Sequence, residues 1–110
     1  MKGIFVESQL FEKHRQKYLT GNEYQALQDS LLLSPKVGDV IVATGGLRKI
    51  RVAAKSKGKR GGVRVIYYYF ENLKRFYLLT LYAKNEVTVL TTDEKHQLKI
   101  FTEAWKNEQT

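Results

Sequence analysis

The sequence predicts an α+β protein in which a mainly antiparallel sheet is combined with an N-terminal helical hairpin and a C-terminal helix. Two observations support this fold class. Apolar residues recur at helical intervals near both ends of the chain, whereas the middle contains short runs of β-branched and aromatic residues separated by turn-like segments. The expected order of elements is β-α-α-β-β-β-β-α, with the helices on one face of the sheet and residues 1–110 forming a single domain.

The first third of the chain predicts a strand followed by two helices. An apolar run at residues 4–6 can form a strand, and Ser8 is placed to cap the helix that follows. Thr20 and Glu23 have the spacing of a capping box, which predicts the start of a second helix. Ser34-Pro35 ends that helix, because proline cannot continue it. The two helices are therefore expected to form a hairpin with a tight turn between them.

The middle of the chain predicts four strands joined by short connections. They are expected at residues 37–43, 47–54, 63–70 and 76–83. Short connections between consecutive strands favour antiparallel pairing. After these strands, Thr91 and Glu94 have capping-box spacing and open a final helix, which carries Leu98, Phe101 and Trp105 on one stripe.

The positive charge of the chain is concentrated in one segment. The formal net charge is +8 and the sequence pI is near 9.7. Residues 47–64 contain eight Lys and Arg residues and no Asp or Glu, while the rest of the chain holds eleven of each sign. A segment of one sign in an otherwise balanced chain indicates a binding surface for a polyanion, and we expect nucleic acid rather than a lipid surface. Residues 55–62, rich in glycine and cations, are expected to be mobile without ligand.

The composition argues against several classes of protein. The chain has no cysteine and therefore no disulfide framework, and its two histidines lie in separate expected helices. We therefore expect no zinc site and no cofactor, although composition leaves a carboxylate-bound Mg²⁺ open. No apolar stretch is long enough to span a bilayer, and the N-terminus lacks the apolar core of a signal peptide. The expected location is cytoplasmic.

Two of the expected strands carry the charged residues with the clearest chemistry. In residues 47–54, the alternation of a strand sends Lys49 and Arg51 to one face and Arg48 to the other. In the next strand, Arg64 follows directly after the basic loop. A guanidinium offers a rigid fork of donors that matches phosphate oxygens and stays charged at any working pH, so Arg64 is a candidate phosphate ligand. The alternative is an ordinary surface arginine.

The end of the last expected strand offers a second pair of candidates. Tyr82 and Lys84 alternate with Leu81 and Ala83, so both can leave the sheet on one face and act together. Equally, the lysine can terminate the strand while the tyrosine packs beneath it. The tyrosines at residues 67–69 are better explained by strand packing, because aromatic side chains suit half-buried pleated surfaces.

Three blocks of the sequence resemble one known family. The blocks are GLRKIR at residues 46–51, GKRGGVRVIYY at residues 58–68 and YLLTLYAKNE at residues 77–86. In order and spacing they resemble the RelE/HigB-type toxins of bacterial type II toxin–antitoxin modules, particularly the HigB branch. The resemblance implies the RelE-like fold and an mRNA interferase that acts on message in the A site of the small ribosomal subunit. It further implies neutralisation by a HigA-like helix-turn-helix antitoxin, in a complex that binds operator DNA.

The resemblance also implies roles for individual residues. Arg64 matches the central arginine of the family, and Tyr82 and Lys84 stand in its last-strand motif. Lys57 and Lys59 occupy the basic loop in which the family places its other catalytic cations. RNA binding is expected from the remaining cations of the basic segment, which are Arg48, Lys49, Arg51, Lys55 and Arg60.

The implied chemistry is attack of the ribose 2′-hydroxyl on the adjacent phosphorus, which leaves a 2′,3′-cyclic phosphate and needs no metal. Arg64 and a lysine would stabilise the charge that develops on the phosphorane. No histidine or glutamate stands beside these residues, so the candidate base is a lysine of the loop or Lys84. Two alternatives remain open, a non-catalytic RNA- or DNA-binding module and a structural partner that holds an acidic protein.

Overall fold

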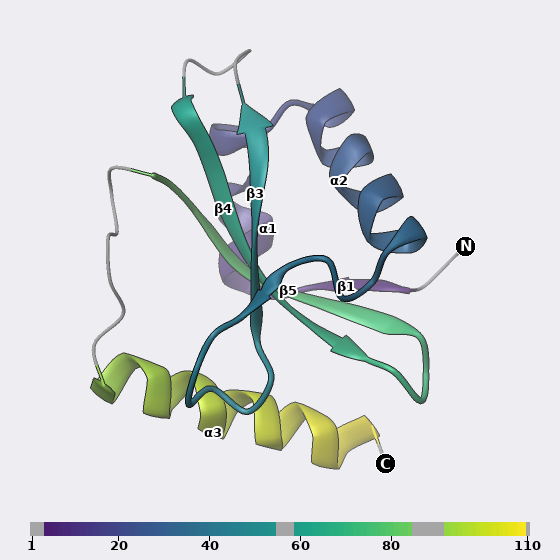
Figure 1. Cartoon of the computed structure of the whole chain (residues 1–110), viewed down its shortest axis with the longest axis vertical. Coiled ribbons are helices and arrows are strands. Elements are labelled where there is room, and N and C mark those ends of the chain that lie inside the picture. Colours follow the sequence, from purple (N-terminus) through teal and green to yellow (C-terminus); the bar gives the residue numbers. More distant parts are fainter. Residues whose placement is uncertain (1–3, 55–58, 85–91, 110) are drawn as a thin grey trace.

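The computed structural model describes residues 4–54, 59–84 and 92–109 of the chain (Figure 1). In these residues the expected order of elements is confirmed. The elements are β1 (Phe5–Glu7), α1 (Gln9–Tyr18), α2 (Gly21–Leu33), β2 (Asp39–Val40), β3 (Arg48–Ala54), β4 (Lys59–Phe70), β5 (Arg75–Ala83) and α3 (Thr92–Gln109). The α+β fold class, with its mainly antiparallel sheet, is therefore confirmed. Within the described part of the chain, no helix has the length and apolar character needed to cross a membrane.

The local sequence explains where the two helices of the hairpin begin. The Ser8 hydroxyl accepts a hydrogen bond from the backbone N–H of Phe11, which caps α1. At the start of α2, the Thr20 hydroxyl accepts from the N–H of Glu23, and the Glu23 carboxylate accepts from the N–H of Thr20. This reciprocal pair confirms the expected capping box. The second helix ends shortly before Pro35, also as expected.

The five strands form one sheet in the order β1-β5-β4-β3-β2. The neighbours β5 and β4, β4 and β3, and β3 and β2 are antiparallel, as their short connections predict. In contrast, β1 pairs in parallel with β5, which the long connection between these two strands permits. The central strand is therefore β4, with β3 on one side and β5 on the other.

The strand expected at residues 37–43 is much shorter than predicted, because a turn replaces its second half. Only Asp39–Val40 pair with β3. Immediately afterwards the N–H of Ile41 donates to the carbonyl of Leu47 at 2.8 Å. The Thr44 hydroxyl donates to the Ile41 carbonyl and accepts from the N–H of Leu47, which closes the turn. The hydroxyl of this buried threonine thus bonds to the backbone three residues before and three residues after it, and the strand ends early.

The fourth strand begins earlier than the sequence suggested. Residues 55–62 were expected to separate two strands, but β4 already starts at Lys59, which pairs with Ala54. Gly61-Gly62 lie within β4, and both glycines have a positive φ that other residues rarely adopt. The remaining residues of the expected mobile loop, 55–58, lie outside the described residues.

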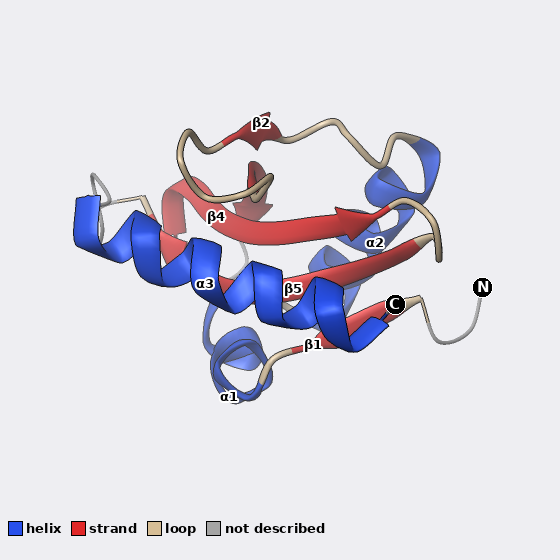
Figure 2. Cartoon of the chain, turned by 90° about the horizontal axis from the view of Figure 1, so that it is seen from below, coloured by secondary structure: helices blue, strands red, loops and turns tan. Residues whose placement is uncertain are grey.

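Helices cover both faces of the sheet rather than one, which corrects the expected arrangement (Figures 1 and 2). The pair α1 and α2 packs on one face, called here the hairpin face, and α3 packs on the other, the α3 face. The reason lies in β4, which buries Val63, Val65 and Tyr67 on the hairpin face and Ile66 and Phe70 on the α3 face. Because both faces of the central strand are apolar, each face needs its own cover.

The C-terminal half of α3 anchors this helix to the sheet. The indole of Trp105 packs against the ring of Tyr77, with centroids 4.2 Å apart. The Lys106 ammonium donates to a backbone carbonyl in the turn between β2 and β3 at 3.1 Å. The capping box expected at the other end, from Thr91 and the Glu94 side chain, lies outside what the structure describes. The described contacts thus fix the C-terminal half of α3 on the sheet.

Candidate functional site

Three of the candidate side chains stand side by side across the middle of the sheet. Arg51 of β3 is opposite Arg64 of β4, and Arg64 is opposite Tyr82 of β5. Residues directly opposite each other project from the same face, with Cβ atoms about 5 Å apart. Tyr82 packs with the apolar cluster under α3, which places all three on the α3 face. We call Arg51, Arg64 and Tyr82 the polar row.

Both arginines of the polar row donate to one backbone carbonyl. Arg51 Nε and Arg64 Nη1 each lie 2.9 Å from the carbonyl oxygen of Gly61. A guanidinium has five N–H donors, and this contact with Gly61 uses one of them in each arginine. Arg51 is exposed and Arg64 is half-buried. The row therefore presents two adjacent guanidinium groups, both fixed to the same backbone acceptor.

Lys84 approaches the same backbone position from the end of β5. Its N–H donates to the Gly62 carbonyl at 3.3 Å. Its Cδ lies 2.7 Å from the point where a Cβ on Gly61 would stand, so the lysine side chain runs directly over this glycine. Arg64 and the pair of Tyr82 and Lys84, which the sequence indicated in two different strands, are therefore close together in the structure.

Tyr82 has a phenol that is harder to ionise than usual. The side chain is half-buried beside the apolar cluster of the α3 face. Burial raises the pKa of Tyr82 above its ordinary value near 10, and the charge of Arg64 offsets part of that increase. At neutral pH this phenol is therefore protonated and can donate a hydrogen bond.

The other residues of the basic segment are described to different extents. Lys49 is exposed and lies one row further along β3, on the α3 face. Lys59 and Arg60 lie at the start of β4, but their side chains are outside what the structure describes. Lys55 and Lys57 lie outside the described residues altogether. The geometry therefore links Lys49 to the polar row and leaves the four other cations as predictions.

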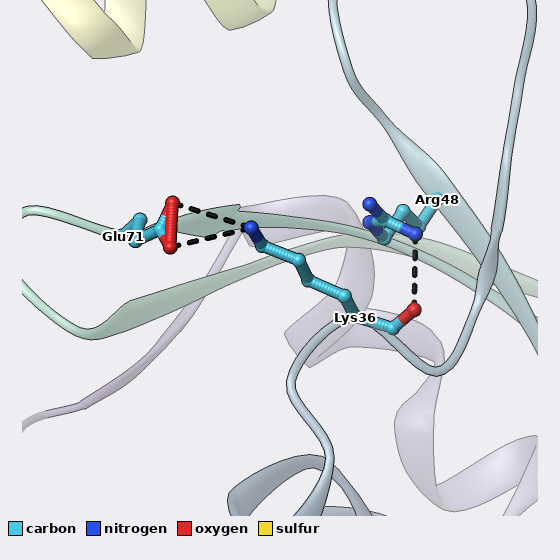
Figure 3. Close-up of polar contacts among 3 residues, drawn as sticks. All are labelled: Lys36, Arg48 and Glu71. Atoms are coloured by element: carbon cyan, nitrogen blue, oxygen red, sulfur yellow. Dashed lines mark hydrogen bonds and ion pairs between the residues drawn. The ribbon is translucent and has the colours of Figure 1, made fainter.

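Arg48 is not brought to the polar row, because it projects from the hairpin face of β3. Its Nη1 donates to the backbone carbonyl of Lys36 at 3.0 Å (Figure 3). The same Nη1 donates to the carbonyl of Gly38 at 2.7 Å. The Lys36 ammonium in turn pairs with the Glu71 carboxylate at 3.2 Å. Arg48 thus holds the segment that leads from α2 into the sheet, which is a structural task.

Sequence reasoning missed the part that Gly61 plays in this site. The adjacent glycines before Arg64 were read as part of a loop, whereas they belong to β4 and place an acceptor beneath two arginines. The available signal was the glycine pair itself, but the register that aligns Arg51 with Arg64 cannot be read from the sequence. Among the described residues, no three His, Cys, Asp or Glu side chains are grouped so that they could hold a metal ion.

The fold and the polar row define a class: a small basic α+β protein whose sheet presents cations to a polyanionic ligand. The chain matches the family model for the RelE toxin of the RelE/RelB toxin–antitoxin system over residues 39–110, nearly two thirds of its length. The chain therefore belongs to the RelE toxin family.

This membership confirms the resemblance to RelE toxins seen in the sequence, although the match does not select the HigB branch. The matched segment runs from β2 through α3 and contains the whole polar row as well as Lys84. The protein is accordingly a toxin of a toxin–antitoxin system, and its partner is an antitoxin. Toxins of this family are generally ribonucleases, so RNA is the polyanion to consider.

Proposed function

We propose that this toxin is a ribosome-dependent endoribonuclease that cleaves messenger RNA and thereby inhibits translation and growth. The observation that carries the proposal is the polar row, in which two guanidinium groups and a neutral phenol stand together beside Lys84. Cleavage of a phosphodiester develops negative charge on the phosphorane oxygens, and fixed donors and cations aimed at that charge are the strongest aid a protein can give.

In this scheme the RNA supplies its own nucleophile. The ribose 2′-hydroxyl attacks the adjacent phosphorus, the 5′-oxygen leaves, and the products carry a 2′,3′-cyclic phosphate and a 5′-hydroxyl. Arg64 lies at the middle of the row and binds the phosphorane oxygens, and Lys84 adds a second positive charge from the end of β5. The scheme uses no metal ion.

The two proton transfers fall to a lysine and to the solvent around it. The candidates are Lys84, two residues beyond Tyr82, and Lys57 and Lys59 of the basic loop. A lysine that takes the 2′-hydroxyl proton becomes a cation as the phosphorane forms, so the same group can then offset the developing negative charge. Tyr82 does not act as an anion in this scheme, because burial raises its pKa. Its phenol positions the reacting ribose by a hydrogen bond or stacks on an unpaired base.

The message backbone is bound by the cations around the row. Lys49 and Arg51 extend the α3 face along β3, and Lys55 and Arg60 continue the same basic segment in the sequence. Arg48 is left out of this surface, because it lies on the hairpin face and bonds to backbone carbonyls.

The rest of the proposal concerns partners and context. The antitoxin is a HigA-like helix-turn-helix protein, and its complex with the toxin binds operator DNA. The toxin acts as a single domain, and its site of action is the cytoplasm, where message is translated. Neutralisation works either by acidic antitoxin residues against the basic segment or by keeping the toxin away from the ribosome.

A direct experiment separates this function from a non-catalytic RNA-binding module. Purified toxin is incubated with a message on translating ribosomes and with the same message free in solution, and all 5′ ends are mapped. The proposal predicts new internal ends on the ribosome-bound message and few on the free one. An intact message that nevertheless co-sediments with the toxin would support the binding module instead. New ends on both messages would retain the nuclease and remove the ribosome dependence.

A further inference from the structure

Gly61 lies where three cationic side chains meet, and the proposed cleavage scheme gives it no task. Its carbonyl oxygen accepts hydrogen bonds from Arg51 and from Arg64, both at 2.9 Å. On its other side, the Lys84 chain passes over its bare Cα. Gly61 therefore contacts a guanidinium group from β3, a second one from β4 and the lysine that directly follows β5.

The backbone around Gly61 has a conformation that strongly favours glycine. The φ angle of Gly61 is +78° and that of Gly62 is +83°, in the region that residues with a Cβ rarely adopt. Between the pairs Val52 with Val63 and Ala54 with Lys59, β4 holds two more residues than β3. The glycines thus form a bulge, and a bulge removes backbone groups from the regular ladder and re-aims what lies beside it.

A side chain at this position would also collide with the side chain of Lys84. A Cβ built on Gly61 would stand 2.7 Å from Lys84 Cδ, closer than real Cβ atoms approach a heavy atom. A substitution would therefore push the lysine away as well as strain the bulge. The displaced lysine and the strained bulge would both shift the positions of the cationic side chains without removing any of the charges.

We propose that Gly61 is a positioning residue for RNA cleavage, whose carbonyl aligns Arg51 and Arg64 and whose bare Cα seats Lys84, so that the three cations converge on one phosphodiester. This inference rests on the proposed function of the polar row. The carbonyl oxygen carries the negative end of a dipole, so it offsets part of the repulsion between two adjacent guanidinium groups. Because each guanidinium spends one N–H on the carbonyl, its remaining donors are held in place before the RNA arrives.

The first test compares three glycine substitutions. Gly61→Ala is expected to lower kcat by about 10- to 100-fold while KM for the ribosome-bound message changes less, because a small displacement of reacting groups costs rate more than binding. Gly21→Ala is the unstrained control, since no atom lies within 4 Å of its Cβ position. Gly46→Ala is the strained control away from the row, with φ of +110° and a Cβ 3.2 Å from the Tyr68 ring. Rates are expressed per folded protein, measured by circular dichroism.

A second test asks whether Gly61 acts through the arginine. Arg51→Lys keeps the charge but loses the Nε–H that donates to the carbonyl, so it is expected to lower kcat by about tenfold on the same argument. Combining it with Gly61→Ala is expected to cost much less than the product of the two single effects, because both changes break one contact. A purely structural glycine would instead show effects that multiply.

Specific outcomes decide the inference. The inference is overturned if Gly61→Ala keeps kcat within about threefold of the value for the unmodified toxin. It is also overturned if the double variant loses kcat by the product of the factors for Gly61→Ala and Arg51→Lys. If Gly61→Ala does not fold, Arg51→Lys alone decides, and unchanged kcat overturns the inference. Failure of the proposed function gives a different result from failure of this inference. In that case the unmodified toxin cleaves no message, or Arg64→Ala cleaves message as fast as the unmodified toxin.

Discussion

The two faces of the central strand β4 perform different tasks with the same backbone. On the hairpin face, Val63, Val65 and Tyr67 are fully buried against α1 and α2. On the α3 face, Ile66 and Phe70 are buried but Arg64 is only half-buried, beside an exposed arginine on β3. The period of two in a strand therefore separates the residues that hold the protein together from those available for chemistry.

Charge alone does not make that distinction, as two arginines of β3 show. Arg48 and Arg51 lie in the same basic segment and were both expected to bind RNA, although strand alternation already assigned them to opposite faces. Arg48 donates to the carbonyls of Lys36 and Gly38 on the hairpin face, whereas Arg51 reaches the α3 face beside Arg64. The position along the strand, rather than the charge, decides which arginine joins the polar row. The predictions below test this contrast between the two faces.

The largest expected effect comes from changing the RNA. In the proposed scheme the ribose 2′-hydroxyl is the nucleophile, and the polar row supplies cations and a neutral phenol around it. A message with a single 2′-O-methyl group at the cleaved nucleotide is expected to lose cleavage there by a factor of about 1,000 or more. The unmodified message serves as the control, and its downstream product is expected to carry a 5′-hydroxyl. Cleavage of the methylated message with a 5′-phosphate product would instead indicate attack by activated water.

A substitution on the hairpin face should affect stability and spare the chemistry. Phe11 is fully buried against α2, and its ring packs beside that of Tyr24. Phe11→Ala is expected to lower the free energy of unfolding by about 3 to 5 kcal/mol, measured by urea denaturation. Leu10→Ala is the matched control, because this neighbouring side chain is 51% exposed. A loss of cleavage per folded molecule in Phe11→Ala would show that the two faces are not independent.

The Tyr82 phenol is expected to aid cleavage by donating a hydrogen bond and not by losing its proton. Burial raises its pKa above the ordinary value near 10, so the group stays protonated from pH 6 to 9. Tyr82→Phe is expected to reduce the cleavage rate about 2- to 10-fold, the value of one hydrogen bond, by the same factor at every pH. The measurement is the pH profile of kcat for both proteins. Disappearance of one limb of the profile in Tyr82→Phe would assign proton transfer to this residue.

The smallest expected effect is a loss of stability in alkali. Burial raises the pKa values of Tyr24, Tyr67 and Tyr82, so above pH of about 10 the folded protein binds more protons than the unfolded chain. The free energy of unfolding should therefore be unaffected by these groups below that pH and fall as the pH rises further. Tyr24→Phe removes one of the three groups, and its stability should decline less steeply between pH 10 and 11. An equal slope for both proteins would contradict the shift.

The sequence predicted the elements whose determinants are local. The cap at Ser8, the capping box of Thr20 with Glu23 and the alternation of β3 and β4 depend on residues a few positions apart, and the structure confirms them. The resemblance to RelE toxins was likewise visible in short blocks and is confirmed by the family match. Local patterns are thus enough for the fold class and for a list of candidate residues.

The features that the sequence did not predict depend on contacts between distant segments. The strand at residues 37–43 is cut short by the Thr44 turn, although its composition favours a strand. The placement of α3 opposite the hairpin was missed, even though both faces of β4 are apolar. The polar row forms only because β3, β4 and β5 pair in one particular register. That register depends on contacts throughout the sheet and cannot be read from any one segment.

The most direct test of the account compares Arg64→Ala with Arg48→Ala, measuring cleavage rate and unfolding free energy on the same preparations. Arg64→Ala is expected to lower cleavage about 100- to 1,000-fold and to change stability by less than about 1 kcal/mol. Arg48→Ala is expected to keep cleavage within about threefold and to lose about 1 to 3 kcal/mol, because two backbone carbonyls lose their donor. A fully active Arg64→Ala, or equal loss of cleavage in both variants, would contradict the assignment of RNA cleavage to the α3 face.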